Sequence, residues 1–164
     1  VTGGSPVFRN NGIKNKPSVE FDGDNLTANI SSKSQPLTIF LVAQTLSENS
    51  ANSPVSSGYN QRFYVRWDGT GWSSDSGLAI RGDNSNPAVL TFVFDGVSSI
   101  IRENSLVTAQ GDTGNNELTE IMLGDEIFNN PFDGYISECI IATTRVPDSD
   151  ISYMETVLSS KWGF

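Results

Sequence analysis

The chain has no histidine and a single cysteine among its 164 residues. Without histidine it can form neither a Ser-His-Asp nor a Cys-His catalytic system, and it has no imidazole to act as a general base or to bind zinc. The lone Cys139 excludes a disulfide bond within the chain. Its place in an apolar run favours the role of a small buried side chain.

Basic residues are also few, with 10 Lys and Arg against 19 Asp and Glu and a net charge of −9. This surplus of negative charge disfavours nucleic acid and anionic membranes as partners. No apolar run approaches the length of about 18 residues that crosses a bilayer, and no cationic leader segment is recognisable. We therefore expect a soluble domain without membrane insertion, either a mature product or part of a longer protein.

The residues that are present favour an all-β chain, because charged residues make up only 18% and Ser, Asn, Thr and Gly are frequent. The length suits one domain over residues 1–164 with a two-sheet core. We expect residues 1–16 to form an irregular lead-in that Val7 and Phe8 hold down. The stretch 47–60 is interpreted as a polar surface loop, with a binding-edge loop as the alternative.

Alternating or continuous apolar runs predict strands over residues 62–67, 72–73, 78–81, 89–94, 98–102, 106–107, 117–123 and 132–142. Because successive side chains of a strand point to opposite faces, one set should face the core and the other solvent. The residues predicted to face outward include Arg62, Tyr64, Arg66, Val89, Thr91 and Val93. The predicted core comprises Phe21, Phe40, Val42, Phe63, Val65, Trp67, Leu90, Phe92, Phe94, Ile136, Ile140, Leu158 and Trp162.

The pattern changes period near the C-terminus. Apolar residues recur there at helical spacing, at Ile151, Met154, Leu158 and Trp162, and predict an amphipathic helix over residues 147–162. Pro147 is tolerated in a first helical turn, where its missing N–H would have had no partner.

The run FDGYISECII, followed by VPDSDISYMETVLSSKWGF, resembles the C-terminal signature of concanavalin A-like (laminin G-like) jelly-roll domains. The stretches SVEFDG, LTIFLVAQ and LTFVFDG resemble earlier strands of that family, in the same order. Two turns depart from the pattern, with Pro147 at the helix cap and Glu103-Asn104-Ser105 in the central hairpin. The resemblance implies a two-sheet antiparallel jelly-roll sandwich with one short C-terminal helix. It leaves function open, because lectins, adhesion modules, glycanases and structural parts share this scaffold.

We expect no enzymatic activity and assign no catalytic residues. Glycanases of this fold carry paired carboxylates in a Glu-x-Asp-x-x-Glu arrangement, and the motif is missing here. Glu117 and Glu120 lie three residues apart, which on a regular strand places them on opposite faces.

The favoured function is a non-catalytic carbohydrate-binding or adhesion module of a larger cell-surface or virion protein, and so extracellular. Its partner would be a glycan, and an acidic polysaccharide is one option. The alternative is a structural decoration or spike domain that binds a protein surface and no sugar. A glycan-cleaving enzyme is the third class.

The predicted ligand-binding residues are Arg62, Tyr64, Arg66, Trp72 and Arg81. Guanidinium groups hold carboxylates or sulfates in a bidentate manner, and a neighbouring aromatic ring can stack on a sugar. The simpler interpretation is that the arginines pair with acidic residues across strands. Trp72 is either a sugar-stacking platform or a packed side chain.

Calcium is the one candidate cofactor. Five carboxylates are expected in turns, and loops of this fold family often hold calcium: Asp22, Asp24, Asp83, Asp112 and Asp125. Calcium needs six to eight oxygen ligands, so several would have to converge. Solvated turn residues are the alternative interpretation.

Overall fold

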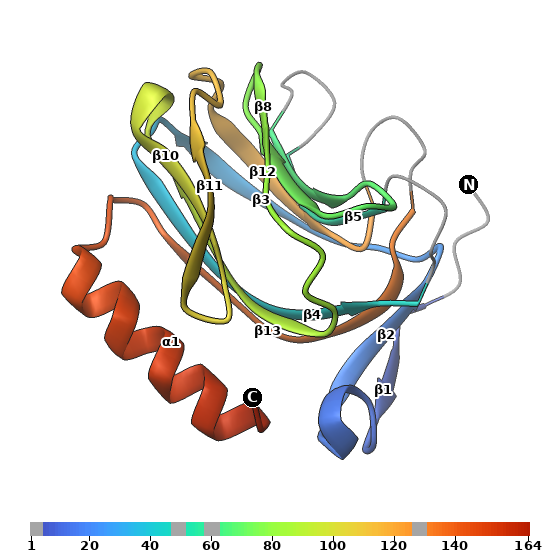
Figure 1. Cartoon of the computed structure of the whole chain (residues 1–164). Helices are drawn as coiled ribbons and strands as arrows, with labels where there is room; N and C mark the ends of the chain where they lie inside the picture. The colour runs from blue at the N-terminus through green and yellow to red at the C-terminus, as the bar shows by residue number, and fades with distance from the viewer. Residues whose placement is uncertain (1–4, 47–51, 58–62, 126–130) are drawn as a thin grey trace.

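The computed structural model describes residues 5–46, 52–57, 63–125 and 131–164, which form two facing β-sheets with a helix outside them (Figure 1). The strands are β1 (Val7–Arg9), β2 (Ser18–Asp22), β3 (Leu26–Lys33), β4 (Leu37–Thr45), β5 (Asn52–Ser56), β6 (Tyr64–Trp67), β7 (Trp72–Asp75), β8 (Ala79–Arg81), β9 (Ala88–Phe94), β10 (Ser99–Glu103), β11 (Leu106–Gly111), β12 (Leu118–Leu123) and β13 (Asp133–Ala142). The helices are η1 (Ile13–Asn15), η2 (Gly96–Ser98) and α1 (Asp148–Trp162).

The larger sheet has seven strands in the order β1-β2-β13-β4-β9-β10-β11, and the smaller has six in the order β3-β12-β5-β6-β7-β8. The paired strands run antiparallel throughout both sheets. This architecture confirms the predicted two-sheet antiparallel jelly-roll sandwich. Non-sequential neighbours such as β2, β13 and β4 show why the fold needs long-range pairing.

The main core lies between the sheets. Strand β4 supplies much of it, because eight of its nine residues are buried. Twelve of the thirteen predicted core residues are buried, and Ile140 is partly buried at the edge of the helix contact. Phe63 stacks on Phe94 with ring centroids 4.2 Å apart and so joins the two sheets.

A second apolar cluster lies between the seven-stranded sheet and α1, which runs along the outer face of that sheet (Figure 1). Val89, Thr91 and Val93 belong to this face and are at most 1% exposed. The prediction that they face solvent was therefore wrong. Alternation placed them on the outer face correctly, but the helix covers that face.

The lead-in differs from the prediction in two ways. Residues 7–9 form β1, which pairs with β2, so the segment is not wholly irregular. Val7 is 44% and Phe8 64% exposed, so neither holds the segment down. Ile13 does so instead, since it is fully buried in the cluster beneath α1.

The predicted loop 47–60 also contains a strand, β5. It pairs with β6 and β12, and its register shifts between Asn52 and Val55. This irregularity accommodates Pro54, which cannot donate to a regular ladder.

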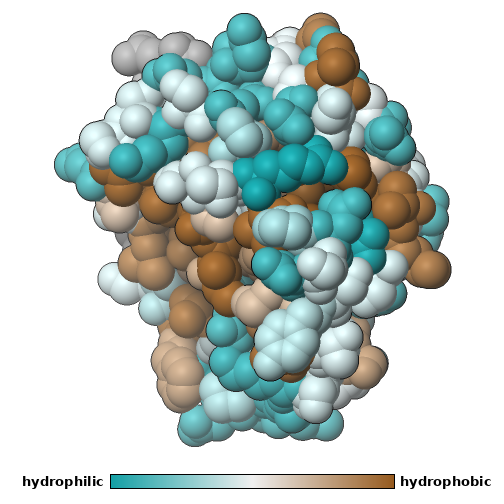
Figure 2. Space-filling model, turned by 90° about the vertical axis from the view of Figure 1, so that its left-hand side faces the viewer, coloured by the Kyte–Doolittle hydropathy of each residue, from teal (hydrophilic) through white to brown (hydrophobic). Residues whose placement is uncertain are grey.

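Exposed apolar side chains are dispersed on the side of the molecule drawn in Figure 2, where polar surface separates several brown patches. Of the large apolar residues that the structure describes, six are more than half exposed: Phe8, Leu78, Val97, Leu106, Val107 and Tyr153. Isolated exposed apolar residues are normal in soluble domains, so only those that meet at one place call for explanation. Among the described residues, no helix has the length and apolar character to span a membrane.

Candidate functional site

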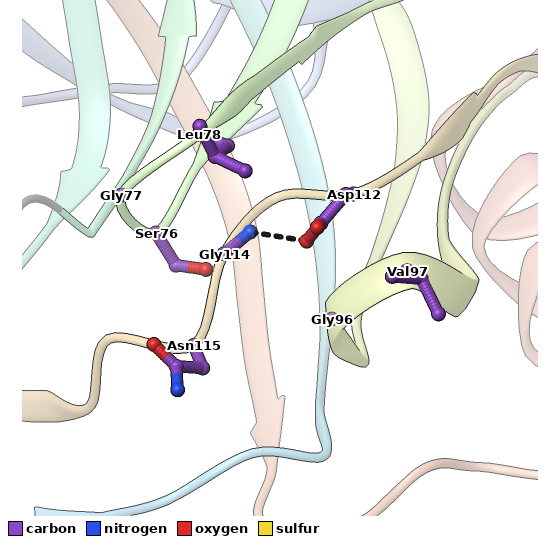
Figure 3. Close-up of a pocket in the computed structure, with 8 residues that line it drawn as sticks. All are labelled: Ser76, Gly77, Leu78, Gly96, Val97, Asp112, Gly114 and Asn115. Carbon is purple, nitrogen blue, oxygen red and sulfur yellow. Dashed lines mark hydrogen bonds between the residues drawn. The ribbon is translucent and has the colours of Figure 1, made fainter.

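Three chain connections meet at one rim of the sandwich and enclose a hollow of about 480 Å³, here called the rim hollow (Figure 3). The first connection links β7 to β8, the second contains η2 between β9 and β10, and the third links β11 to β12. The lining residues are Ser76, Gly77, Leu78, Gly96, Val97, Asp112, Gly114 and Asn115.

The side chain of Gln35 ties these connections together. Its amide nitrogen donates to Ser76 Oγ at 2.7 Å and to the Gly114 carbonyl oxygen at 3.1 Å. Its amide oxygen accepts from the Gly96 backbone N–H at 2.8 Å. One amide thus contacts all three walls of the rim hollow, which holds their relative positions.

A buried network of hydroxyl groups lies against the same walls. Ser76, Ser99 and Thr113 are fully buried, and Thr113 Oγ1 lies 2.7 Å from Ser99 Oγ and 3.3 Å from Ser76 Oγ. The Thr113 carbonyl accepts from the backbone N–H groups of Ser76 and Leu78, at 2.8 and 2.9 Å. Satisfied buried polar networks are rigid, so the rim hollow is a preformed feature of the fold.

The groups that line the rim hollow combine polar and apolar chemistry. Asp112 Oδ1 accepts from the Gly114 N–H at 2.8 Å, the interaction dashed in Figure 3. Asp112 and Asn115 are both exposed. The side chain of Asn115 makes no hydrogen bond to the rest of the described chain. Leu78 and Val97 are 53% and 74% exposed. The rim hollow therefore offers carboxylate and amide groups next to an aliphatic surface.

The predicted arginine and tyrosine face has a different geometry from the one expected. Tyr64 is only 4% exposed, and its hydroxyl donates to Asp75 Oδ2 at 2.9 Å, so its ring is not presented to solvent. The half-buried Arg66 stacks on that ring, with the guanidinium carbon 4.9 Å from the centroid. Arg66 Nε is buried and has no hydrogen-bond partner among the described residues. Arg62 lies outside the described residues.

Trp72 is not a sugar-stacking platform. It is fully buried, packs edge-on against Trp67 and donates from Nε1 to the Ser85 carbonyl at 2.7 Å. Arg81 keeps a side chain that is 62% exposed, and its Nε lies 2.6 Å from Asp68 Oδ2. Of the predicted binding residues, the structure therefore does not bring the four that it describes, Tyr64, Arg66, Trp72 and Arg81, together in one accessible site.

The five predicted calcium carboxylates are dispersed as well. Within the described ranges, no group of three or more His, Cys, Asp or Glu side chains is arranged to hold a metal ion. Asp22 and Asp24 line a second hollow beside β2, Asp112 lines the rim hollow, and Asp83 and Asp125 lie apart from both. Asp22 is the last residue of β2 and not a turn residue as predicted. The connections that carry the other carboxylates are at different places in the sandwich, so a site made of all five does not form.

The second hollow has its own electrostatics. Asp133 is the cross-strand partner of Asp22. Burial, followed by the charges of Asp22 and Glu20, raises the pKa of Asp133 above its usual range. Arg9 is the basic residue of this hollow and pairs with Glu20.

Sequence reasoning missed the rim hollow. Its only local signals are the turn-rich run Gly111 to Asn116 and a leucine, Leu78, directly after a glycine. Neither signal distinguishes a binding site from an ordinary turn, because the site depends on three separate connections meeting.

No family model and no curated protein matches the chain. Solved structures do match in fold. Domain 4 of AbnA, a GH43 extracellular arabinanase from Geobacillus stearothermophilus, in complex with arabinotriose, is 17% identical with a TM-score of 0.69, over 93% of this chain and 82% of that one. The binding domain of botulinum neurotoxin serotype G is 12% identical with a TM-score of 0.68, over 98% of this chain and 46% of the other. The CBM40 of Ruminococcus gnavus IT-sialidase, bound to α2,3-sialyllactose, is 13% identical with a TM-score of 0.59, over 81% and 98%.

At these identities the likeness establishes the fold. The chain has the jelly-roll β-sandwich architecture that these structures share.

Proposed function

We propose that this domain is a non-catalytic glycan-binding module of the concanavalin A-like group and that the glycan binds in the rim hollow. The observation that carries the proposal is that exposed polar groups and exposed aliphatic groups meet in one preformed hollow. Asp112 and Asn115 supply the polar groups, and Leu78 and Val97 supply the aliphatic ones.

The chemistry of these groups matches that of a sugar. Each sugar hydroxyl both donates and accepts, so a carboxylate and an amide side by side can engage two neighbouring hydroxyls. The C–H groups of a sugar ring form an apolar surface that can pack against Leu78 and Val97. The volume of about 480 Å³ lies within the usual range of ligand sites, about 300–1,000 Å³.

The charge of the rim hollow favours a neutral glycan. Among the described residues that line it, Asp112 is the one that is charged, and a carboxylate repels the acidic group of an acidic sugar. The Arg66 side of the six-stranded sheet remains the alternative location for an acidic glycan. Its support is the buried Arg66 Nε, which has no protein partner in the described chain.

Structural relatives support the class of ligand. Two of the similar structures hold oligosaccharides, arabinotriose in one and α2,3-sialyllactose in the other. An extracellular location, on a cell surface or a virion, follows from a glycan partner in the same proposal.

The test is a glycan array followed by calorimetric titration of the best neutral and acidic oligosaccharides. We expect a neutral ligand, and at least a tenfold loss of affinity in both Asp112→Ala and Asn115→Ala, because each variant removes hydrogen bonds to the sugar. Asp83→Ala is the matched control, since Asp83 is an exposed aspartate away from the hollow.

Three other outcomes would contradict the proposal. Loss of binding in Arg66→Ala, with Asp112→Ala unchanged, would move the site to the sheet face. Absence of binding to any glycan would favour the structural module with a protein partner. Release of reducing ends from a polysaccharide, measured in the same samples, would identify a glycan-cleaving enzyme.

A further inference from the structure

Strand β13 has one edge that is only partly paired. On the side of β2, its ladder covers Asp133 to Ile136 and ends there. Residues 138–142 pair with β4 on the other side, and none of them makes a backbone hydrogen bond to another described strand. Alternate residues of a strand direct their N–H and C=O groups to each side. This stretch therefore presents unpaired donors and acceptors on the side of β2.

The chain before β2 explains why the pairing stops. Pro17 directly precedes β2 and has no N–H group to donate to a ladder. The residues before it turn back, with a hydrogen bond from the Gly12 N–H to the Lys16 carbonyl oxygen at 2.9 Å. Ile13 of this turn is buried in the cluster beneath α1. No described strand therefore continues β2 along residues 138–142.

An apolar crevice of about 190 Å³, here called the side crevice, opens at the beginning of this free edge. Its lining residues are Val19, Phe21, Leu26, Leu123, Ile136, Ser137, Glu138 and Cys139, which are apolar apart from Ser137 and Glu138. Ile30, Ile121 and Ile141 also pack against the main core but remain only partly buried. They belong to β3, β12 and β13, so apolar surface extends from the side crevice along the inner faces of these strands.

The free edge lacks the features that normally keep a sheet edge from pairing with another chain. Native edges carry charged side chains, prolines or bulges for this purpose. The run Cys139-Ile140-Ile141-Ala142 has no charge and no proline, and the bulge of β13 lies before it, between Ile136 and Glu138. The carboxylate of Glu138 is held by Lys161 and Trp162 of α1, at 2.6 and 2.8 Å. The edge is therefore open to a further strand.

We propose that an extended segment of a partner protein pairs with residues 138–142 as an added strand and places an apolar side chain in the side crevice. The unpaired backbone groups specify a strand, because neither a helix nor a sugar offers a matching ladder of N–H and C=O groups. The side crevice specifies apolar residues at alternate positions, since every second side chain of an added strand points between the sheets. Its volume lies below the roughly 300 Å³ of small-molecule sites and suits a side chain.

The sheet order favours a single extended segment over a second copy of the domain. Strand β13 is not an outer strand, because β2 and β1 lie beyond it in the seven-stranded sheet. A whole sandwich would have to approach the free edge past these two strands. A segment of about five residues needs only the length of the edge itself, about 17 Å.

The test uses an array of synthetic peptides with apolar residues at alternate positions, each compared with a scrambled peptide of the same composition. We expect the full chain to bind some alternating peptides and not their scrambled forms. Leu26→Ala should weaken binding of the best peptide about tenfold, because Leu26 is 48% exposed at the side crevice and would be buried by the partner. Leu106→Ala, at an exposed leucine outside the side crevice, is the matched control and should bind like the wild type. Leu26→Ala should leave glycan binding unchanged, since the side crevice and the rim hollow share no lining residue.

Amide hydrogen exchange tests the strand pairing itself. In the free domain, alternate N–H groups of residues 138–142 should exchange rapidly, and a saturating peptide should slow their exchange at least tenfold. Absence of this protection would overturn the proposal, and so would equal affinities of the wild type and Leu26→Ala. Failure of every alternating peptide to bind would overturn it as well. A dimer in sedimentation velocity whose contact protects the same N–H groups would make a second copy the occupant and would also contradict the proposal.

Discussion

The carboxylate of Glu155 on α1 accepts two hydrogen bonds from the guanidinium of Arg102 on β10, at 2.8 Å from Nε and 3.0 Å from Nη2. Thr91 on β9 donates a third, at 2.8 Å. Glu155 is 1% exposed, so the ion pair lies inside the contact between helix and sheet. The hydrogen bond to Glu155 raises the pKa of Arg102, although burial acts in the opposite direction. This contact fixes how α1 lies on the sheet.

Removal of the Glu155 charge should destabilise the domain strongly. A buried pair that loses one partner leaves the other charge uncompensated, which costs about 3–5 kcal/mol. We expect Glu155→Ala to lower the free energy of unfolding by that amount in a denaturant titration.

Two control variants test whether the loss in Glu155→Ala comes from the buried charge. The Arg145–Asp95 pair is partly exposed at 2.9 Å, and Asp95→Asn should cost less than about 1 kcal/mol. The double variant Arg102→Met/Glu155→Leu should recover much of the lost stability, because it removes both charges. A Glu155→Ala loss no larger than that of Asp95→Asn would show that the buried pair adds nothing.

Trp162 should contribute about as much to the free energy of unfolding as Glu155 does. Trp162 is the last residue of α1. It is 7% exposed, packs in the cluster between helix and sheet, and donates from Nε1 to Glu138 Oε2 at 2.8 Å. Trp162→Ala should cost about 3–5 kcal/mol, because it opens a cavity under the helix. Trp162→Phe keeps the apolar ring and should lose only about 1 kcal/mol with the hydrogen bond. An unchanged denaturant midpoint in Trp162→Ala would mean that the helix contributes little to stability.

Two glycines of the rim hollow form a matched pair for testing its backbone. Both have positive φ, +84° at Gly114 and +52° at Gly96. A Cβ at Gly114 would lie 2.5 Å from the Ser76 carbonyl oxygen, whereas at Gly96 no heavy atom lies within 4 Å. Gly96→Ala should cost about 1–2 kcal/mol from conformation alone. Gly114→Ala should cost clearly more and also weaken glycan binding, measured by thermal unfolding and calorimetry. Equal losses in the two variants would contradict this account of the hollow's wall.

The thiol of Cys139 should be unreactive in the native protein. The residue is partly buried at the edge of the core, and burial of its thiol raises the pKa to about 12. At pH 8 only about one thiol in 10⁴ is then the reactive thiolate. Labelling with a thiol reagent should be slow in buffer and rapid in guanidinium chloride, where the thiol regains its ordinary pKa. Rapid labelling of the folded protein at pH 8 would show that the thiol is accessible and ionised.

Local patterns were sufficient for the C-terminal third of the chain. The apolar run at 132–142 and the helical spacing from Ile151 to Trp162 correspond closely to β13 and α1. The apolar residues at helical spacing nevertheless included Met154, which is only partly buried, and the pattern missed Glu155, which is buried. A charged residue enters such a face only when the sheet supplies a partner, and Arg102 lies more than 50 positions away in the chain.

Three strands escaped prediction for related reasons. Most side chains of β3 are exposed, because it is an edge strand paired only with β12, so it has no apolar alternation to recognise. Strand β5 is buried but consists mainly of polar residues and proline. Strand β1 is short and exposed throughout. Their positions come from pairing with partners distant in sequence.

The sequence alone determined the fold class, the main strands and the C-terminal helix, because side-chain periodicity is a local property of a strand or helix. It also determined the absence of histidine chemistry. Tertiary structure decided which outward faces are covered, so that Val89 and Val93 are buried by α1 and Trp72 lies within the core. It alone assembled the rim hollow, since residues 76–78, 96–97 and 112–115 meet only when the sheets close over the core. Contacts between distant segments depend on the packing of the whole chain, and no local pattern records them.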